Sequence, residues 1–148
     1  YDLGFKKRKP TLQKIRKAVL KIRSKKFPDL RKCGTAGSFF KNPIVSKSHY
    51  LSLASHISNL QWYPPEKLSY HNETQIPATV KIPAGRLLDE LGWKGKTIGQ
   101  VSTSPNQALY VINLGGATGA EIFEFAEMMR TDIKKNFDIN LEYEVQII

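Results

Sequence analysis

Residues 118–148 read TGAEIFEFAEMMRTDIKKNFDINLEYEVQII, a helix pattern followed directly by a strand pattern. Thr118 and Glu121 form a T-x-x-E capping box, which marks the start of a helix. The apolar residues after it recur at helical spacing: Ile122, Phe125, Ala126, Met129 and Ile133. From Ile139 to Ile147 apolar and polar residues alternate strictly, which predicts a strand with one buried face. The stretch therefore predicts a helix packed on a sheet.

Three further helices are expected before this stretch. The first opens at Thr11, and its apolar residues recur at helical spacing and are expected in the core: Leu12, Ile15, Val19 and Ile22. Ser46 fits the N-cap of the second helix, because a serine hydroxyl can accept a hydrogen bond from the first turn. The third carries three leucines and ends before Gly92, a residue suited to the left-handed conformation beyond a helix end.

Short strands complete the pattern. Phe39–Phe40 is predicted to be a short buried strand that follows a tight connection over residues 34–38, and residues 79–82 another strand. Residues 98–103 and 107–114 are expected to pair as an antiparallel hairpin around a Pro-Asn turn. The predicted fold class is α+β, a small, mostly antiparallel sheet with helices packed on it.

Composition is that of a globular protein of 148 residues, with 41% hydrophobic and 24% charged residues. No apolar run approaches the length needed to cross a bilayer, and no signal peptide is visible, so we expect no membrane partner. Cys33 has no second cysteine to pair with, and the three histidines are scattered without metal-site spacing. These features predict a cytoplasmic protein without a metal site.

The positive charge is concentrated at one end of the chain. Residues 1–32 hold 13 Lys or Arg and 2 Asp or Glu, whereas residues 33–148 hold 10 basic and 11 acidic residues. Such a block could attract nucleic acid, anionic lipid or a phosphorylated small molecule, or could simply be the solvated face of a basic helix. Few aromatic residues lie within the block, which weakens the nucleic-acid interpretation.

Taken without any resemblance, no residue stands out as catalytic. The GGATG turn at residues 115–119 lacks the Gly-Lys-Ser/Thr ending of a phosphate loop, so a glycine-rich connector is the preferred interpretation. Ser38 has neither a nearby His nor a glycine two residues later, which argues against a hydrolytic nucleophile, although a hydroxyl can act as a positioned proton donor. Glu144 lies on the polar face of the last predicted strand, where contact with solvent is the simplest explanation.

Short motifs in chain order resemble the UDP-N-acetylenolpyruvoylglucosamine reductases over nearly the whole chain from Pro10. The most distinctive is GTAGSFFKNP at residues 34–43. The others are KFPD at 26–29, VKIPAG at 80–85, the stretch from Leu91 to Gly99, PNQAL at 105–109 and LEYEV at 141–145. The resemblance implies the two-layer α+β fold of that family's C-terminal, substrate-binding domain at residues 34–148. Residues 1–33 would then be a basic helical lead-in from the preceding part of a longer chain.

The resemblance also implies roles for individual residues. Ser38 corresponds to the serine that protonates C2 of the enolpyruvyl group after a hydride reaches C3, and Glu144 to the catalytic glutamate that assists the same intermediate. The substrate, UDP-N-acetylenolpyruvoylglucosamine, needs cationic and amide groups for its diphosphate and uridine. Four positions correspond to such contacts: Lys26, Asn42, Lys81 and Gln107.

The implied whole protein is an NADPH- and FAD-dependent oxidoreductase of peptidoglycan synthesis, which forms UDP-N-acetylmuramate. Members of the family carry FAD-binding domains in the N-terminal part of the same chain, and nothing in these 148 residues supplies a flavin site. We therefore expect a fragment that binds neither cofactor and is inactive by itself, without a nucleic-acid partner. The alternative is a non-catalytic module that binds a UDP-sugar or nucleic acid through the basic N-terminal segment, in the latter case with steep salt dependence.

Overall fold

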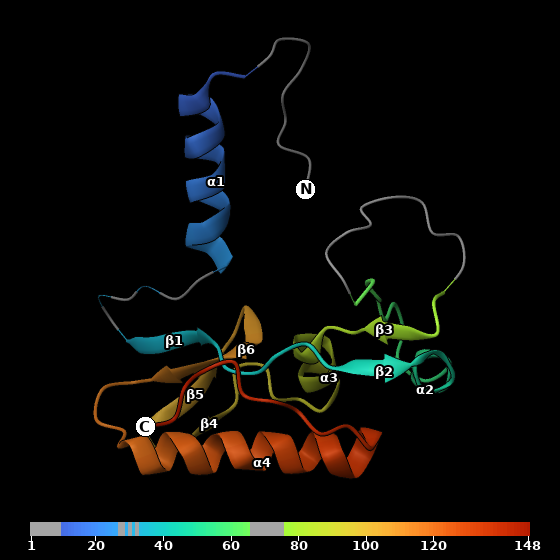
Figure 1. Ribbon diagram of the computed structural model, residues 1–148. Coiled ribbons are helices and arrows are strands. Elements are labelled where there is room, and N and C mark those ends of the chain that lie inside the picture. Colours follow the sequence, from blue (N-terminus) through green and yellow to red (C-terminus); the bar gives the residue numbers. More distant parts are fainter. Residues whose placement is uncertain (1–9, 27–28, 30, 32, 66–75) are drawn as a thin grey trace.

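The computed structural model describes residues 10–26, 29, 31, 33–65 and 76–148, and it confirms the predicted α+β fold class. A four-stranded sheet packs on the longest helix, and a two-stranded sheet with two shorter helices lies beside it (Figure 1). A fourth helix, nearest the N-terminus, projects away from these layers.

The larger sheet has the strand order β1-β6-β5-β4, and every neighbouring pair is antiparallel. Its strands are β1 Gly34–Ser38, β4 Thr97–Ile98, β5 Val101–Ser104 and β6 Gln107–Asn113. The predicted hairpin is confirmed, because β5 and β6 pair across the turn at residues 105–106. These two central strands are almost entirely buried, and four of their residues belong to the main hydrophobic core: Val101, Ala108, Leu109 and Val111.

Residues 34–38 form strand β1, so the predicted tight connection there is wrong, and Phe39–Phe40 follow the strand as buried residues. Ladder hydrogen bonds use only the backbone, so a stretch of small residues can pair with β6 without any apolar pattern of its own. Ser38 lies opposite Tyr110, after a shift in register. Gly37, inside that irregular stretch, has a φ of 85°, a conformation that glycine adopts at little cost.

The smaller sheet pairs two antiparallel strands, each followed closely by a helix: β2 Ile44–Ser46, α2 Lys47–Ala54, β3 Thr79–Lys81 and α3 Ala84–Glu90. Ser46 is the N-cap of α2 as predicted, and its hydroxyl accepts a hydrogen bond from His49 N at 3.2 Å. Gly92 follows α3 with a φ of 73°, which confirms the predicted left-handed residue after that helix.

Helix α4 (Gly119–Phe137) lies under the four-stranded sheet (Figure 1), and its predicted capping box is confirmed. Thr118 Oγ1 accepts from Glu121 N at 3.2 Å, while the Glu121 carboxylate accepts from Thr118 N at 2.7 Å. Four residues of the predicted apolar stripe are buried: Phe125, Ala126, Met129 and Ile133. Trp93 packs edge-on against the ring of Phe125 and donates from Nε1 to Asp132 at 2.9 Å. These two contacts join the chain after α3 to this helix.

Residues 138–148 do not form the strand that their alternation predicts. They contain an isolated bridge between Phe40 and Tyr143 instead of a ladder. The alternation still predicts burial at the start of the segment, where Ile139 and Leu141 are 4% and 3% exposed. Beyond the hydrogen bonds around this bridge, the C-terminal segment adds no ladder to the edge of β1, so alternation alone does not produce a strand.

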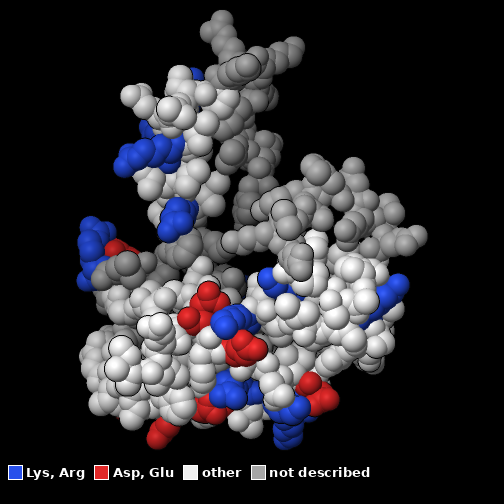
Figure 2. Space-filling model, viewed as in Figure 1, with Lys and Arg blue, Asp and Glu red and all other residues white. Residues whose placement is uncertain are grey.

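Helix α1 (Leu12–Lys26) forms as predicted, but its apolar stripe is not in the core. Leu12 and Val19 are 85% and 42% exposed, because α1 projects from the rest of the described structure (Figure 1). Seven of its 15 residues are Lys or Arg and none is acidic, and Figure 2 shows basic side chains along it. Helical spacing predicts an apolar face but not the presence of a surface to cover it. Among the described helices, none combines the length and hydropathy needed to cross a bilayer.

The capping box predicts a pH-dependent contribution to stability. Hydrogen bonds from the Thr118 N–H and hydroxyl lower the pKa of Glu121 below its ordinary value of 4.5. This contribution is therefore present above pH 4.5 and is lost as the pH falls through the lower, folded-state pKa. In urea denaturation, Glu121→Gln should reduce the free energy of unfolding at pH 6, and the difference from the parent protein should shrink toward zero at pH 3.

Glu124→Gln is the matched control, because it removes the same charge from the same helix without touching the cap. An equal loss for Glu121→Gln at both pH values would contradict a role for the ionised carboxylate.

Candidate functional site

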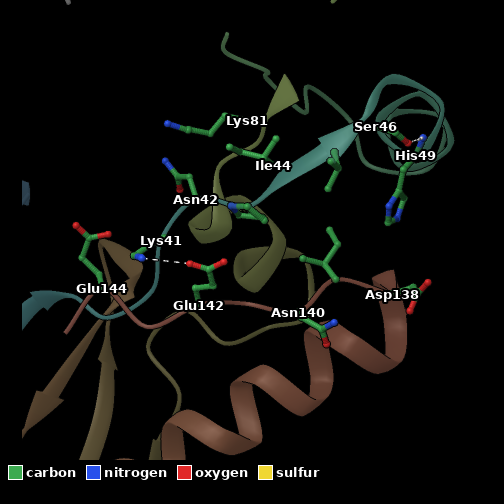
Figure 3. A pocket seen from close by; sticks show the side chains of 13 residues that line it. Lys41, Asn42, Ile44, Ser46, His49, Lys81, Asp138, Asn140, Glu142 and Glu144 are labelled. Atoms are coloured by element: carbon green, nitrogen blue, oxygen red, sulfur yellow. Dashed lines mark hydrogen bonds and ion pairs between the residues drawn. The ribbon is translucent and has the colours of Figure 1, made fainter. Parts of the chain in front are cut away.

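A polar groove of about 740 Å³ lies between the segment that follows β1 and the segment that follows α4 (Figure 3). Three parts of the chain line it: residues 41–46 with His49 of α2, Lys81 of β3, and residues between 138 and 144. Figure 3 shows Glu144 at one end and His49 near Asp138 at the other. The groove therefore depends on how the C-terminal segment is held against the chain after β1.

Two backbone hydrogen bonds join these segments, a contact that we call the C-terminal crossing. Lys41 N donates to Glu142 O at 2.9 Å, and Glu144 N donates to Phe39 O at 2.9 Å. Because Phe39 directly follows Ser38, the crossing brings the backbone of Glu144 within one residue of the candidate serine. Ser38 is half-buried at the end of β1 and does not line the groove, whereas Glu144 is exposed and lines it.

The two lysines of the groove differ in their electrostatic surroundings. Lys41 Nζ forms an ion pair with Glu142 Oε2 at 3.1 Å across the crossing, which neutralises its charge locally (Figure 3). Lys81 forms no ion pair with any described residue, and its backbone is fixed on both sides by Ile44 in β2 and by two hydrogen bonds of 2.9 Å with Tyr63. Lys81 thus has a fixed backbone and, among the described residues, no ion-pair partner, which suits it to bind an anionic ligand.

Asn42 has a structural partner within the fold. Its Oδ1 accepts a hydrogen bond from Ala84 N at 3.0 Å, in the first turn of α3. The N-cap residue of that helix is Pro83, which has no capping side chain, so Asn42 satisfies a donor that the helix leaves unpaired. Because the oxygen is used in this way, the amide NH2 group remains as a donor toward the groove that Asn42 lines.

The other two predicted substrate contacts lie outside the groove lining. Gln107 is the first residue of β6, and its Oε1 lies 2.9 Å from where a Cβ on Gly85 would stand. The Gln107 side chain therefore packs closely against Gly85 at the start of α3, and a larger residue there would displace its amide. Lys26 ends α1, and its side chain lies outside the described part of the chain.

The far end of the groove contains residues that the sequence did not single out. His49 Nε2 donates to Phe137 O at 2.8 Å, the last carbonyl of α4, which makes Nε2 the protonated ring nitrogen. Asp138 ends that helix in the left-handed conformation with a φ of 53°. A hydrogen bond from Lys134 at 2.6 Å lowers the pKa of Asp138 below its ordinary value. No sequence signal links His49 to a residue 88 positions away.

The glycine-rich turn is a connector, as predicted, and it is closed by a side chain. Asn113 Oδ1 accepts hydrogen bonds from the backbone N–H groups of Gly115, Gly116 and Ala117 at 2.9, 3.1 and 3.1 Å. Those donors are already used, so the turn is not a cradle for the diphosphate of a dinucleotide. Within the described ranges, no three His, Cys, Asp or Glu side chains come close enough together to hold a metal ion.

These observations define an α+β domain in which a C-terminal segment closes a polar groove beside a serine and a glutamate. Residues 28–148 match the sequence profile of a protein family described as "UDP-N-acetylenolpyruvoylglucosamine reductase, C-terminal domain". The chain belongs to this family.

Several curated proteins named UDP-N-acetylenolpyruvoylglucosamine reductase are similar to the chain. One from Porphyromonas gingivalis is 39% identical over 139 residues, which are 94% of this chain and 38% of that protein. One from Bacteroides fragilis is 37% identical over 138 residues, 93% of this chain and 39% of the relative. A third, from Paraburkholderia phymatum, is 40% identical over 135 residues, 91% and 36% of the two chains. The chain therefore spans well under half the length of these relatives.

The structural role of Asn42 can be separated from any role in binding. Asn42→Ala removes the acceptor for the buried Ala84 N–H and should cost about 1 kcal/mol in urea denaturation. Asn42→Asp keeps an acceptor there and should stay within about 0.5 kcal/mol of the parent protein. Equal losses for the two substitutions would contradict the capping role.

Proposed function

We propose that this chain is the substrate-binding part of a UDP-N-acetylenolpyruvoylglucosamine reductase, which forms UDP-N-acetylmuramate for peptidoglycan synthesis. Family membership supports the reaction, and the C-terminal crossing is the observation that carries the assignment of residues. It holds Glu144 in a polar groove and next to the residue that follows Ser38. The whole reaction requires a longer chain, because the curated relatives are more than twice as long as the region they share with this one.

The cofactors FAD and NADPH, which supply the hydride, are expected to be bound by the part of the enzyme outside these residues. Among the described residues, the one glycine-rich turn before a helix has its N–H groups bonded to Asn113, so it offers no cradle for their diphosphates. The contribution of this chain is therefore to bind the substrate and to deliver a proton.

Reduction of the enolpyruvyl double bond adds a hydride at C3 and a proton at C2. Negative charge develops at C2 and in the adjoining carboxylate as the hydride arrives. The Ser38 hydroxyl donates the proton to C2, and Glu144 assists either the charged intermediate or its protonation. A fixed donor on one side of the substrate also defines the configuration of the new centre.

The groove suits the diphosphate and sugar of the substrate. Lys81 supplies a positive charge that no described side chain neutralises, and the Asn42 amide is oriented by its bond to Ala84 so that its NH2 group can donate. Lys26 and Gln107 remain proposed contacts on the basis of the family resemblance.

Ser38→Ala tests the proton transfer in the full-length reductase that contains this domain. Loss of a general acid should slow substrate-dependent oxidation of the reduced flavin by about 10²- to 10⁴-fold in single-turnover measurements. Ser52→Ala, an exposed serine of α2, is the control and should leave the rate unchanged. An unchanged rate for Ser38→Ala would remove this serine from the mechanism.

Lys81 and Lys41 form a matched pair for testing the binding of the diphosphate. A charge-assisted hydrogen bond is worth about 1.5–3 kcal/mol, so Lys81→Met should raise KM for the UDP-sugar about 10- to 100-fold. Lys41→Met should have a much smaller effect, because Lys41 already pairs with Glu142. Equal increases in KM for both variants would contradict the distinct role of Lys81.

A further inference from the structure

The side chain of Tyr143 lies between the C-terminal crossing and α4. Tyr143 directly precedes Glu144 and forms the isolated bridge with Phe40, and the two rings stack with centroids 5.4 Å apart. Phe39 meets the same ring edge-on, with centroids 5.9 Å apart. Tyr143 therefore packs on both of the residues that follow Ser38.

The hydroxyl of Tyr143 is anchored to α4. It donates a hydrogen bond to Glu127 Oε1, the same oxygen that accepts from Arg130 Nη1 at 2.7 Å. The guanidinium of Arg130 lies 5.1 Å from the centre of the tyrosine ring, and the ring of Phe123 lies 5.9 Å away. Tyr143, Glu127 and Arg130 thus form one cluster that joins the C-terminal segment to the helix.

Near neutral pH, the protonation states of Tyr143 and Glu127 favour the hydrogen bond between them. Burial raises the pKa of the Tyr143 hydroxyl above its ordinary value of 10.0, so the hydroxyl keeps its proton. The hydrogen bond from Tyr143 lowers the pKa of Glu127 below its ordinary 4.5, so the carboxylate remains an acceptor. A neutral donor facing an ionised acceptor is a strong form of hydrogen bond.

We propose that Tyr143 is a positioning residue, which holds Glu144 in the groove and the chain after Ser38 in place by anchoring the C-terminal crossing to α4. The inference rests on the proposed function, because it assumes that Glu144 takes part in the proton transfer. Successive side chains of an extended segment point to opposite faces, so directing Tyr143 toward α4 directs Glu144 toward the groove. Tyr143 itself does not line the groove, so it acts through its neighbour.

The crossing needs such an anchor because its backbone pairing is short. Two hydrogen bonds, which together make the single bridge between Phe40 and Tyr143, join the segments, and a pair of strands without further strands or packing is only marginally stable. The ion pair between Lys41 and Glu142 adds little, since both side chains are largely exposed. The packing of Tyr143 on Phe40 and its hydrogen bond to Glu127 are therefore the main contacts that fix the position of Glu144.

Tyr143→Phe tests the anchor, because it keeps the ring and deletes only the hydroxyl. In the full-length reductase we expect kcat to fall about 10- to 100-fold, since misplacing a reacting group by about 1 Å costs on this order. KM should change less than about threefold, because the residue does not touch the groove. Glu124→Gln, on the same helix but outside the cluster, is the control and should change neither constant.

A double-mutant cycle separates positioning from general destabilisation. Glu144→Gln is measured alone and together with Tyr143→Phe. If Tyr143 acts through Glu144, the second substitution causes no further loss of kcat in the Glu144→Gln background. An equal loss in both backgrounds overturns the proposal, because Tyr143 would then act independently of Glu144.

The failure of this inference can be distinguished from failure of the proposed function. If Glu144→Gln alone leaves kcat unchanged, the assigned role of Glu144 fails and the inference fails with it. If Glu144→Gln lowers kcat and Tyr143→Phe does not, only the inference is overturned. Should Tyr143→Phe fail to fold, Glu127→Ala removes the acceptor and leaves the ring, with the same expected loss of kcat, and an unchanged kcat for that variant also overturns the proposal.

Discussion

The two backbone hydrogen bonds of the C-terminal crossing are the constraint on which the groove depends. One wall is the chain after β1, which the central strand β6 holds through Phe39 N and Leu109 O at 3.0 Å. The other wall is an extended segment that belongs to no regular sheet. Burial of Ile139 and Leu141 holds the start of this wall, and the crossing holds residues 142–144 against the chain after β1. The crossing therefore fixes the backbone of the candidate glutamate.

Helix α4 fixes the position of that second wall. The capping box fixes its start, and its end is fixed by Asp138 in the left-handed conformation and by the bond from His49 to Phe137 O. Its buried stripe packs under the sheet, so the C-terminal segment leaves from a defined point. Tyr143 returns the segment to the same helix at Glu127. The position of the groove wall at residues 142–144 therefore depends on its contact with α4.

The two lysines of the groove differ in their charge pairing. Glu142 neutralises Lys41 within the crossing, whereas Lys81 is mounted on β3 without an ion-pair partner among the described residues. Asn42 contributes to folding and to the groove at once, since its oxygen caps α3 and its NH2 group stays available. The backbones of these residues are fixed by hydrogen bonds, so a ligand would have to order mainly the side chains of Lys81 and Glu144 when it binds.

Local signals in the sequence determined the helices and the hairpin, because a cap such as Ser46 or a turn such as Pro105-Asn106 acts within a few positions, whereas the alternation after residue 138 did not by itself produce a strand. The family resemblance added Asn42, Lys81 and Glu144, which the fold brings to one groove. The pairing of β1 through its backbone, the exposure of the α1 stripe and the entry of His49 into the groove could not be predicted in this way. Each depends on which distant segment supplies a partner, and only the tertiary structure decides that, because contacts between segments far apart in the chain leave no periodic trace in either one.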